Sequence, residues 1–417
     1  MKRTALLFSL VLLGVGACHR TPVARPWLGP VESVEVPAPA GSRFPHLAGG
    51  QGLPVVLSWL QPGAEPQYSL QLAQWTDHGF GVPRGWSAPR TVATGSDWFV
   101  NWADFPSVVP VSERVWAAHW LQQQPGDIYS YDVRIAVSAN GGRRWSAPLT
   151  PHDDGTPTEH GFVTLLPTGD EHVRALWLDG RNTPGEHDHA ASPGAPSGAM
   201  TLRAAELNAS GRLVGPGAEI DARVCDCCQT DAVNVGDATV VVYRDRSERE
   251  VRNIRAARIE ADGKVSSVDV HDDAWHIAAC PVNGPAIAAQ GTLVAVAWFT
   301  APDAPRVRLA FSTDGGRSFA PPIEVASGNV LGRVDVAFVG HGRAVVSWLT
   351  RAATGSELEV QPFTAGGAAG TAVTIARVGL SHSSGFPQMV RAGEGLLFAW
   401  TEAGESQRVR SAFAPLL

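Results

Sequence analysis

One pattern recurs through this chain: a run of apolar residues that ends in or near an aromatic side chain. These aromatic positions follow one another at intervals of roughly 50 to 66 residues, and they are Trp59, Trp120, Trp177, Tyr243, Trp298, Trp348 and Trp400. Short apolar runs bounded by Gly, Pro or Asp are typical of antiparallel strands. One such unit is a small sheet that cannot bury its own faces, so the repeats have to pack on one another.

A repeat of this length with several strands per copy predicts an all-β fold, the β-propeller. The clearest copy runs from Cys280 to Pro322, with strands at 293–298 and 307–311. Seven copies predict seven four-stranded blades. The last copy holds only three strands, so we expect the N-terminal segment 33–36 to supply the fourth and close the ring. The 44 Gly and 31 Pro residues agree with a fold rich in turns.

The N-terminus has the features of an export signal. Lys2 and Arg3 precede an apolar run from Ala5 to Val15, which is too short for a stable transmembrane helix. The small residues before Cys18 resemble a bacterial lipobox, which implies cleavage before Cys18 and attachment of lipid to it. We therefore expect a signal peptide at 1–17, a lipid anchor with a Pro-rich tether at 18–39, and the propeller at 40–417. The expected location is the cell envelope, and His19 favours the outer membrane over the inner.

Two turns resemble the Asp-box of the sialidase superfamily. Each places a Ser, an Asp or Asn, a Gly and an aromatic residue at fixed spacing, and the two sets are Ser138, Asn140, Gly142, Trp145 and Ser312, Asp314, Gly316, Phe319. Asp314 and Asn140 are expected to accept hydrogen bonds from backbone N–H groups of the turn. The resemblance implies a propeller fold and a structural role for these turns. Because the sialidase fold usually has six blades, six is the alternative to seven.

The segment Arg43-Phe44-Pro45 resembles the Arg-Ile-Pro motif of sialidases, which implies that Arg43 binds a substrate carboxylate. Four further arginines near the starts of blades are candidates to join it around an anion: Arg181, Arg244, Arg246 and Arg333. By position, Asp104 is the acid–base candidate and Tyr243 a candidate nucleophile. The resemblance thus implies either an exo-sialidase-like glycoside hydrolase or a non-catalytic glycan binder. The alternative is that these arginines are loop charges and salt bridges between blades.

Four cysteines remain after Cys18: Cys225, Cys227, Cys228 and Cys280. They open the fourth and fifth blades, so we expect them to meet on one rim. In an exported chain they favour disulfides, with Cys225 or Cys227 joined to Cys280. Thiolates with imidazole also suit copper or zinc, and His276 and His160 stand at comparable places. Disulfide stapling, a Cys/His metal site and thiol redox chemistry therefore remain open, and no cofactor is certain.

The formal charge of −7 argues against a nucleic-acid partner, because phosphate binding needs a basic face. The expected partners are the membrane, through the lipid, and a glycan or an envelope protein. The sequence leaves the oligomeric state open. Two hypotheses follow: a propeller that recognises or hydrolyses an anionic glycan through an Arg-lined central mouth, and a scaffold or metal-handling lipoprotein that uses the Cys/His rim.

Overall fold

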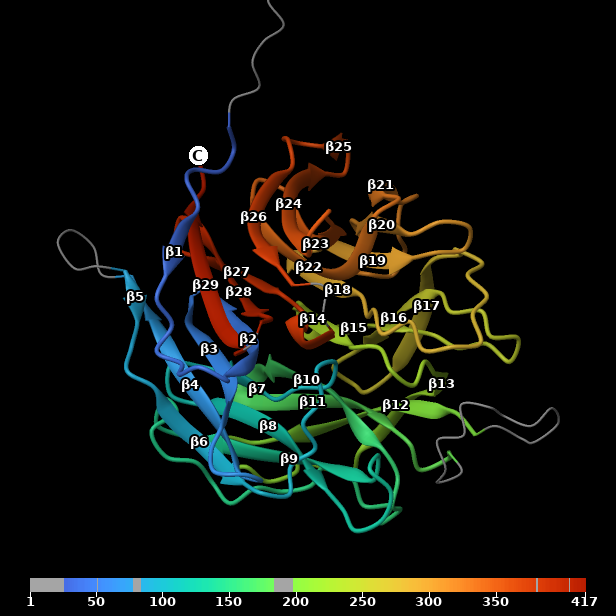
Figure 1. The fold of residues 1–417 in the computed structure, drawn as a ribbon. Helices are drawn as coiled ribbons and strands as arrows, with labels where there is room; N and C mark the ends of the chain where they lie inside the picture. The colour runs from blue at the N-terminus through green and yellow to red at the C-terminus, as the bar shows by residue number, and fades with distance from the viewer. Residues whose placement is uncertain (1–25, 51, 78–83, 184–197, 380–381, 405) are drawn as a thin grey trace, which may run out of the picture.

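The computed structural model describes residues 26–50, 52–77, 84–183, 198–379, 382–404 and 406–417. The chain forms a seven-bladed β-propeller, with the innermost strand of each blade around a common axis (Figure 1). The predicted fold class and the blade number are thereby confirmed. The lipobox, Cys18 and the signal segment lie outside the described residues.

The first three blades follow one another along the chain. Blade one consists of β2 (Arg43–Gly50), β3 (Leu53–Pro62), β4 (Tyr68–Thr76) and β6 (Arg90–Gly95), with the short β5 (Gly85–Trp86) also paired to β4. Blade two consists of β7 (Ser107–Pro110), β8 (Trp116–Gln123) and β9 (Tyr131–Ser138), and its fourth position holds only an isolated bridge from Ile135 to Leu149. Blade three consists of β10 (His160–Thr168), β11 (His172–Asp179), β12 (Met200–Leu207) and β13 (Ala218–Val224), with the 3₁₀ turn η1 (Gly169–Glu171) between β10 and β11.

The next three blades repeat this arrangement. Blade four consists of β14 (Asp231–Val235), β15 (Ala238–Arg244), β16 (Ile254–Ile259) and β17 (Val265–His271). Blade five consists of β18 (Ala286–Gln290), β19 (Leu293–Thr300), β20 (Arg306–Ser312) and β21 (Ile323–Ser327). Blade six consists of β22 (Val330–Gly340), β23 (Arg343–Arg351), β24 (Ser356–Thr364) and β26 (Val373–Val378), with the two-residue β25 (Gly367–Ala368) also paired to β24.

Both ends of the chain build the seventh blade. It consists of β27 (Gln388–Ala392), β28 (Gly395–Glu402), β29 (Arg408–Pro415) and β1 (Glu32–Val34), and the 3₁₀ turn η2 (His382–Ser384) precedes it. Ser33 lies opposite Ala412 in the β1–β29 pair. The expected closure of the ring by an N-terminal strand is therefore confirmed.

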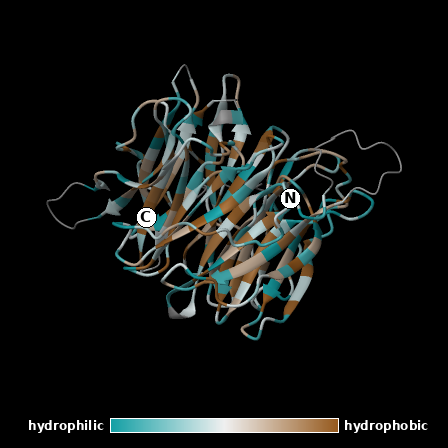
Figure 2. Cartoon of the chain, turned by 90° about the horizontal axis from the view of Figure 1, so that it is seen from below, coloured by the Kyte–Doolittle hydropathy of each residue, from teal (hydrophilic) through white to brown (hydrophobic). Residues whose placement is uncertain are grey.

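The core lies between the blades. The seven aromatic residues that define the repeat are all in second strands and all buried. The buried apolar residues of the described chain form seven clusters, and most members of each cluster belong to two neighbouring blades. Figure 2 shows the apolar stretches along the strands and more polar colours in the loops. Each blade thus buries its faces against its neighbours, as the sequence predicted.

Two faces of the ring have different roles. We call the face where the first strand of each blade begins the front face, and the opposite one the back face. Because the strands are antiparallel, the connection after each second strand returns to the front face. Among the described residues, no helix is long and apolar enough to cross a membrane.

Candidate functional site

The two turns with Asp-box spacing share one hydrogen-bonding pattern and lie on the back face. The Asp314 carboxylate accepts bonds from the backbone N–H groups of Arg317 and Ser318, each at 3.0 Å. Asn140 accepts the equivalent bonds at 3.1 and 2.9 Å. Hydrogen bonds from the Ser318 side chain and the turn hold the pKa of Asp314 down at about 2. These contacts stabilise the turns and leave no free group for chemistry.

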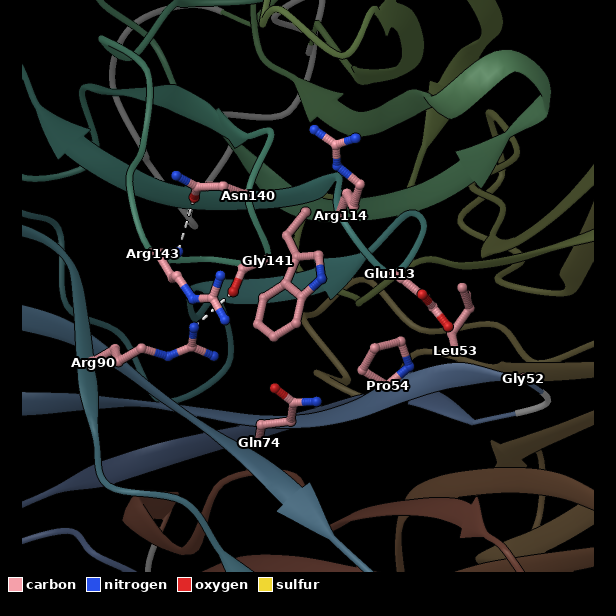
Figure 3. A pocket seen from close by; sticks show the side chains of 11 residues that line it. Gly52, Leu53, Pro54, Gln74, Arg90, Glu113, Arg114, Asn140, Gly141 and Arg143 are labelled. Carbon is pink, nitrogen blue, oxygen red and sulfur yellow. Dashed lines mark hydrogen bonds between the residues drawn. The ribbon is translucent and has the colours of Figure 1, made fainter.

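A hollow of about 700 Å³ lies beside one of these turns, between blades one and two (Figure 3). Its walls include three arginines, Arg90, Arg114 and Arg143. Arg90 donates to the carbonyl oxygen of Gly141 at 2.7 Å. Burial, followed by the charge of Arg143, lowers the pKa of Arg90. The hollow is thus on the back face, away from the residues that the sequence singled out for chemistry.

A cavity of about 560 Å³ lies along the axis of the propeller and is lined by the innermost strands. Three aspartates line it, one buried and two half-buried, and each ties one blade to the next. Asp104, Asp231 and Asp335 accept hydrogen bonds from the backbone N–H groups of Phe162, Ile287 and Met389, respectively. Burial raises the pKa of Asp104 and of Asp335 to about 8 and that of Asp231 to about 6.

Asp104 also contacts a buried tyrosine. The Tyr131 hydroxyl lies 2.6 Å from Glu159 Oε1 and 3.1 Å from Asp104 Oδ2. Burial, and then the charges of Glu159 and Asp104, raise the pKa of Tyr131 well above its ordinary value. Gly161 makes this approach possible, because a Cβ at that position would lie 1.9 Å from Asp104 Oδ2. The structure thus holds a carboxylate-supported tyrosine, but at Tyr131, which the sequence had not singled out.

Tyr243, the tyrosine named from the sequence, lies elsewhere. It is buried at the end of β15, and its hydroxyl donates to Asp221 Oδ2 at 2.6 Å. Among the described residues that line the axial cavity, Asp104 is present and Tyr243 is absent. The structure therefore does not bring these two candidates together.

The five candidate arginines are also spread over the front face, and none is among the described residues that line the axial cavity. Arg244 is buried and donates to the carbonyl oxygens of Arg252, Asn283 and Phe299. Arg246 pairs with Asp226 and Glu250, and Arg181 pairs with Asp179 and Asp154. Their guanidinium groups thus hold loops and blades together, as the alternative interpretation expected.

Arg43 and Arg333 are held by aromatic rings. Arg43 donates to the Tyr68 hydroxyl at 3.1 Å and lies 5.4 Å from the ring centre. Arg333 donates to the Gly385 carbonyl and lies 5.0 Å from the centre of the Trp102 ring. Burial lowers the pKa of Arg333 to about 10. Their role in binding an anion remains a prediction.

The cysteines come together on the front face, as expected. We define the thiol cluster as Cys225, Cys227, Cys228 and Cys280. The Sγ atom of Cys225 lies 3.5 Å from that of Cys228 and 4.0 Å from that of Cys227. Contacts with Cys225, Cys228 and Cys280 raise the pKa of Cys227. All four thiols are free in this structure, and the disulfides suggested by the sequence remain a prediction for the oxidised chain.

Two arginines supply positive charge to the thiol cluster. Arg252 Nη1 donates to Cys225 Sγ at 3.0 Å. Burial by itself would raise the pKa of Cys228, but hydrogen bonds from Cys225 and Cys227 and the charge of Arg244 lower it well below its usual range. The lowered pKa favours the thiolate at Cys228, which is the form that binds metals, whereas burial raises the pKa of Cys225 to about 11. The cluster is thus a candidate centre for a soft metal ion.

The two histidines proposed as further ligands do not join the thiols. His276 is exposed, and its backbone forms a bridge with Val251. The group of cysteine ligand atoms found within 4.8 Å of one another in the described chain contains neither His276 nor His160. His160 instead belongs to a group of histidines and aspartates between blades two and three, including His152 and Asp154, which the sequence analysis did not identify. Only the spacing of His152 and His160 on either side of an acidic stretch could have suggested it.

Comparisons with known proteins extend only to the fold. No protein-family model matches this sequence, and neither does any curated protein. Among solved structures, a protein of unknown function from Dyadobacter fermentans has a TM-score of 0.53 at 12% identity, over 94% of this chain and 100% of that one.

The solved neighbours also include glycosidase propellers. A Streptococcus pneumoniae sialidase has a TM-score of 0.47 at 7% identity, over 93% of this chain and 94% of its own. An α-L-arabinanase from Penicillium chrysogenum has a TM-score of 0.47 at 11% identity, over 94% and 98%. Similarity at such low identity transmits no activity to this chain.

Proposed function

We propose that this protein is an exported, lipid-anchored propeller that binds a soft metal ion, copper(I) or zinc, at the thiol cluster. One observation carries the proposal: the Sγ atoms of Cys225, Cys227 and Cys228 all lie within 4.8 Å of one another. Thiolates select copper(I) and zinc among biological metals. Cys280 beside Cys227 supplies a fourth thiol, and Arg244 and Arg252 place positive charge beside Cys228 and Cys225, respectively.

The test is the metal and thiol content of the full chain, extracted from membranes in detergent without added reductant. We expect about one copper or zinc ion per chain, lost in the double variant Cys227→Ser/Cys228→Ser. Asp226→Asn is the matched control, because it alters the same turn and keeps every thiol. Two disulfides and no bound metal in the wild-type chain would overturn the proposal and establish the cluster as a staple.

A second candidate function is recognition or hydrolysis of an anionic glycan in the axial cavity. The observation that favours it is Tyr131, held between Asp104 and Glu159, since a tyrosine supported by a carboxylate is what the glycosidase hypothesis required. With its pKa raised to about 8, Asp104 is protonated at neutral pH, as a general acid must be. Tyr131 is fully buried, so a substrate would meet Asp104 first.

This candidate is tested by turnover of a fluorogenic sialoside. If it holds, Tyr131→Phe lowers the rate by about 10²-fold or more, the usual contribution of a positioned acid–base or nucleophilic group. Tyr129→Phe is the control, because Tyr129 lies two residues away and packs against Phe99, with its ring tilted by 57° to the Phe99 ring. Absence of turnover by the wild-type chain, or equal rates in both variants, would remove hydrolysis from consideration.

A further inference from the structure

A second cluster of ligand-type side chains lies on the front face between blades two and three. We define the His/Asp cluster as Asp132, His152, Asp154, His160 and Asp179. Asp132 is on β9, His160 begins β10 and Asp179 ends β11, while His152 and Asp154 lie in the loop that joins blades two and three. Ring closure and blade packing bring these segments together. The cluster is separate from the thiol cluster, which lies on blades four and five.

The hydrogen bonds of His160 define its tautomer. Its Nδ1 lies 3.1 Å from the carbonyl oxygen of Thr158 and 3.3 Å from that of Tyr131. Carbonyl oxygens only accept hydrogen bonds, so Nδ1 carries a proton. The other nitrogen, Nε2, faces two carboxylates, at 3.2 Å from Asp154 Oδ2 and 3.9 Å from Asp179 Oδ1. A metal-ligating histidine characteristically donates its other N–H to a backbone carbonyl in this way.

His152 faces carboxylates with both of its nitrogens. Nδ1 lies 3.3 Å from Asp154 Oδ1, and Nε2 lies 3.5 Å from Asp132 Oδ1. Despite these distances, His152 Nε2 and Asp154 Oδ1 are buried and make no hydrogen bond of acceptable geometry within the described chain. The two side chains are only 4% and 7% exposed. Asp154 Oδ1 still faces the Arg181 guanidinium at 3.2 Å, whereas His152 Nε2 has no hydrogen-bond partner within the described chain. A buried polar atom without a hydrogen bond is costly, and a bound ion would satisfy it.

The net charge of the His/Asp cluster also favours a bound cation. Three carboxylates face one guanidinium, that of Arg181, which leaves a net charge of about −2 when the histidines are neutral. The rings of His152 and His160 stack with their centres 3.8 Å apart and 2° between their planes. Two positively charged imidazoles at this distance would repel each other, so protonation of both histidines is a costly way to balance the charge.

We infer that the His/Asp cluster is a metal site for a divalent transition-metal ion, such as zinc, that accepts imidazole and carboxylate ligands. The ligand atoms fall into two groups that share His160, with Asp132 and His152 in one and Asp154 and Asp179 in the other, all within 4.8 Å inside each group. Asp179 is already held by Arg181 and by Trp177 Nε1, so it orients the site. His160 and Asp154 are its central ligands, and a small movement of the His152 ring brings in the third.

The zinc content and thermal unfolding of the full chain test this site. Asp154→Asn should lose one zinc ion per chain relative to the wild type, and zinc should no longer raise its Tm. The neighbouring Asp153→Asn is the matched control: it makes the same change of charge on a side chain that is 98% exposed. It should bind zinc as the wild type does. His152→Asn is measured alongside, because it removes a different donor, and it should weaken zinc binding about 10- to 100-fold.

Cobalt(II) distinguishes this site from the thiol cluster, because thiolate ligands give an intense charge-transfer band that imidazole and carboxylate ligands do not. Cobalt bound in the Cys227→Ser/Cys228→Ser variant should show only the spectrum of nitrogen and oxygen ligands. Zinc content equal to that of the wild type in folded Asp154→Asn and His152→Asn would overturn the inference. So would an equal loss in Asp153→Asn, which would indicate a general effect of charge.

Discussion

Asp335 illustrates how single residues hold neighbouring blades together. Its carboxylate lines the axial cavity and accepts hydrogen bonds from the backbone N–H groups of Val336 and Met389, at 2.7 Å each. Burial, followed by the charge of Asp231, raises the pKa of Asp335 to about 8. Two N–H donors therefore do not fully offset the loss of water around the charge. The position of this group in the fold, and not its sequence neighbours, determines its ionisation.

The raised pKa predicts how stability depends on pH. An unfolded aspartate ionises near pH 3.9, whereas folded Asp335 keeps its proton up to about pH 8, so the folded chain binds more protons in between. The free energy of unfolding should therefore fall as pH rises from about 6.5 to about 8. Asp335→Asn should make this decline shallower by up to about 1.4 kcal/mol per pH unit in urea unfolding.

Asp314→Asn is the control for this measurement. Asp314 has a pKa of about 2 and stays ionised across the whole pH window. His46 and His119, whose pKa values burial lowers to about 4 and about 3, stay neutral there. The pH slope of Asp314→Asn should thus match that of the wild type. An unchanged slope in Asp335→Asn would show that Asp335 ionises normally in the folded chain.

At the scale of elements, β1 and the segment around it hold the N-terminus against the propeller. The segment around it buries Trp27, Leu28 and Val36 against blades six, seven and one. The Trp27 indole also donates to the Thr371 carbonyl at 2.8 Å. Part of the segment that the sequence described as a tether is therefore bound to the propeller. By pairing with β29, β1 covers an edge that would otherwise be exposed.

A truncated chain tests this closure. A chain that begins at residue 40 lacks β1 and the three buried side chains around it. At roughly 1.5 to 3 kcal/mol for each buried side chain, its free energy of unfolding should fall by about 5 kcal/mol or more. A chain that begins at residue 26 keeps the segment and is the control. Equal urea midpoints for the two chains would show that the ring is stable without β1.

The elements that the sequence predicted well are those with local signals. Alternating apolar strands and the turns at Asn140 and Asp314 follow from spacing along the chain, because strand alternation and side-chain-capped turns involve near neighbours. The thiol cluster was also foreseen, since Cys225, Cys227 and Cys228 are adjacent and Cys280 occupies the same place in the next repeat. The local pattern did not show which arginines form hydrogen bonds or ion pairs within the protein.

At the scale of the whole molecule, the candidate functional sites all lie on the front face. The thiol cluster, the His/Asp cluster and the residues around Tyr131 all lie at the front ends of strands or in the loops next to them. Backbone groups there are not all used by the sheets, so loops can present side chains freely. Both proposed metal sites thus lie on the front face, whereas the turns at Asn140 and Asp314 stabilise the back face.

The sequence by itself determined the architecture: the number of blades, the aromatic residues buried between them, the closing strand and the capped turns. Only the tertiary structure decided which reactive groups meet. His152 stacks on His160, and Tyr131 reaches Asp104 and Glu159, because blades two and three pack side by side. The packing of blades four and five likewise places Arg244 where it donates to three backbone carbonyls. Strand periodicity is a property of neighbours along the chain, whereas a site depends on contacts between segments that only the closed ring brings together.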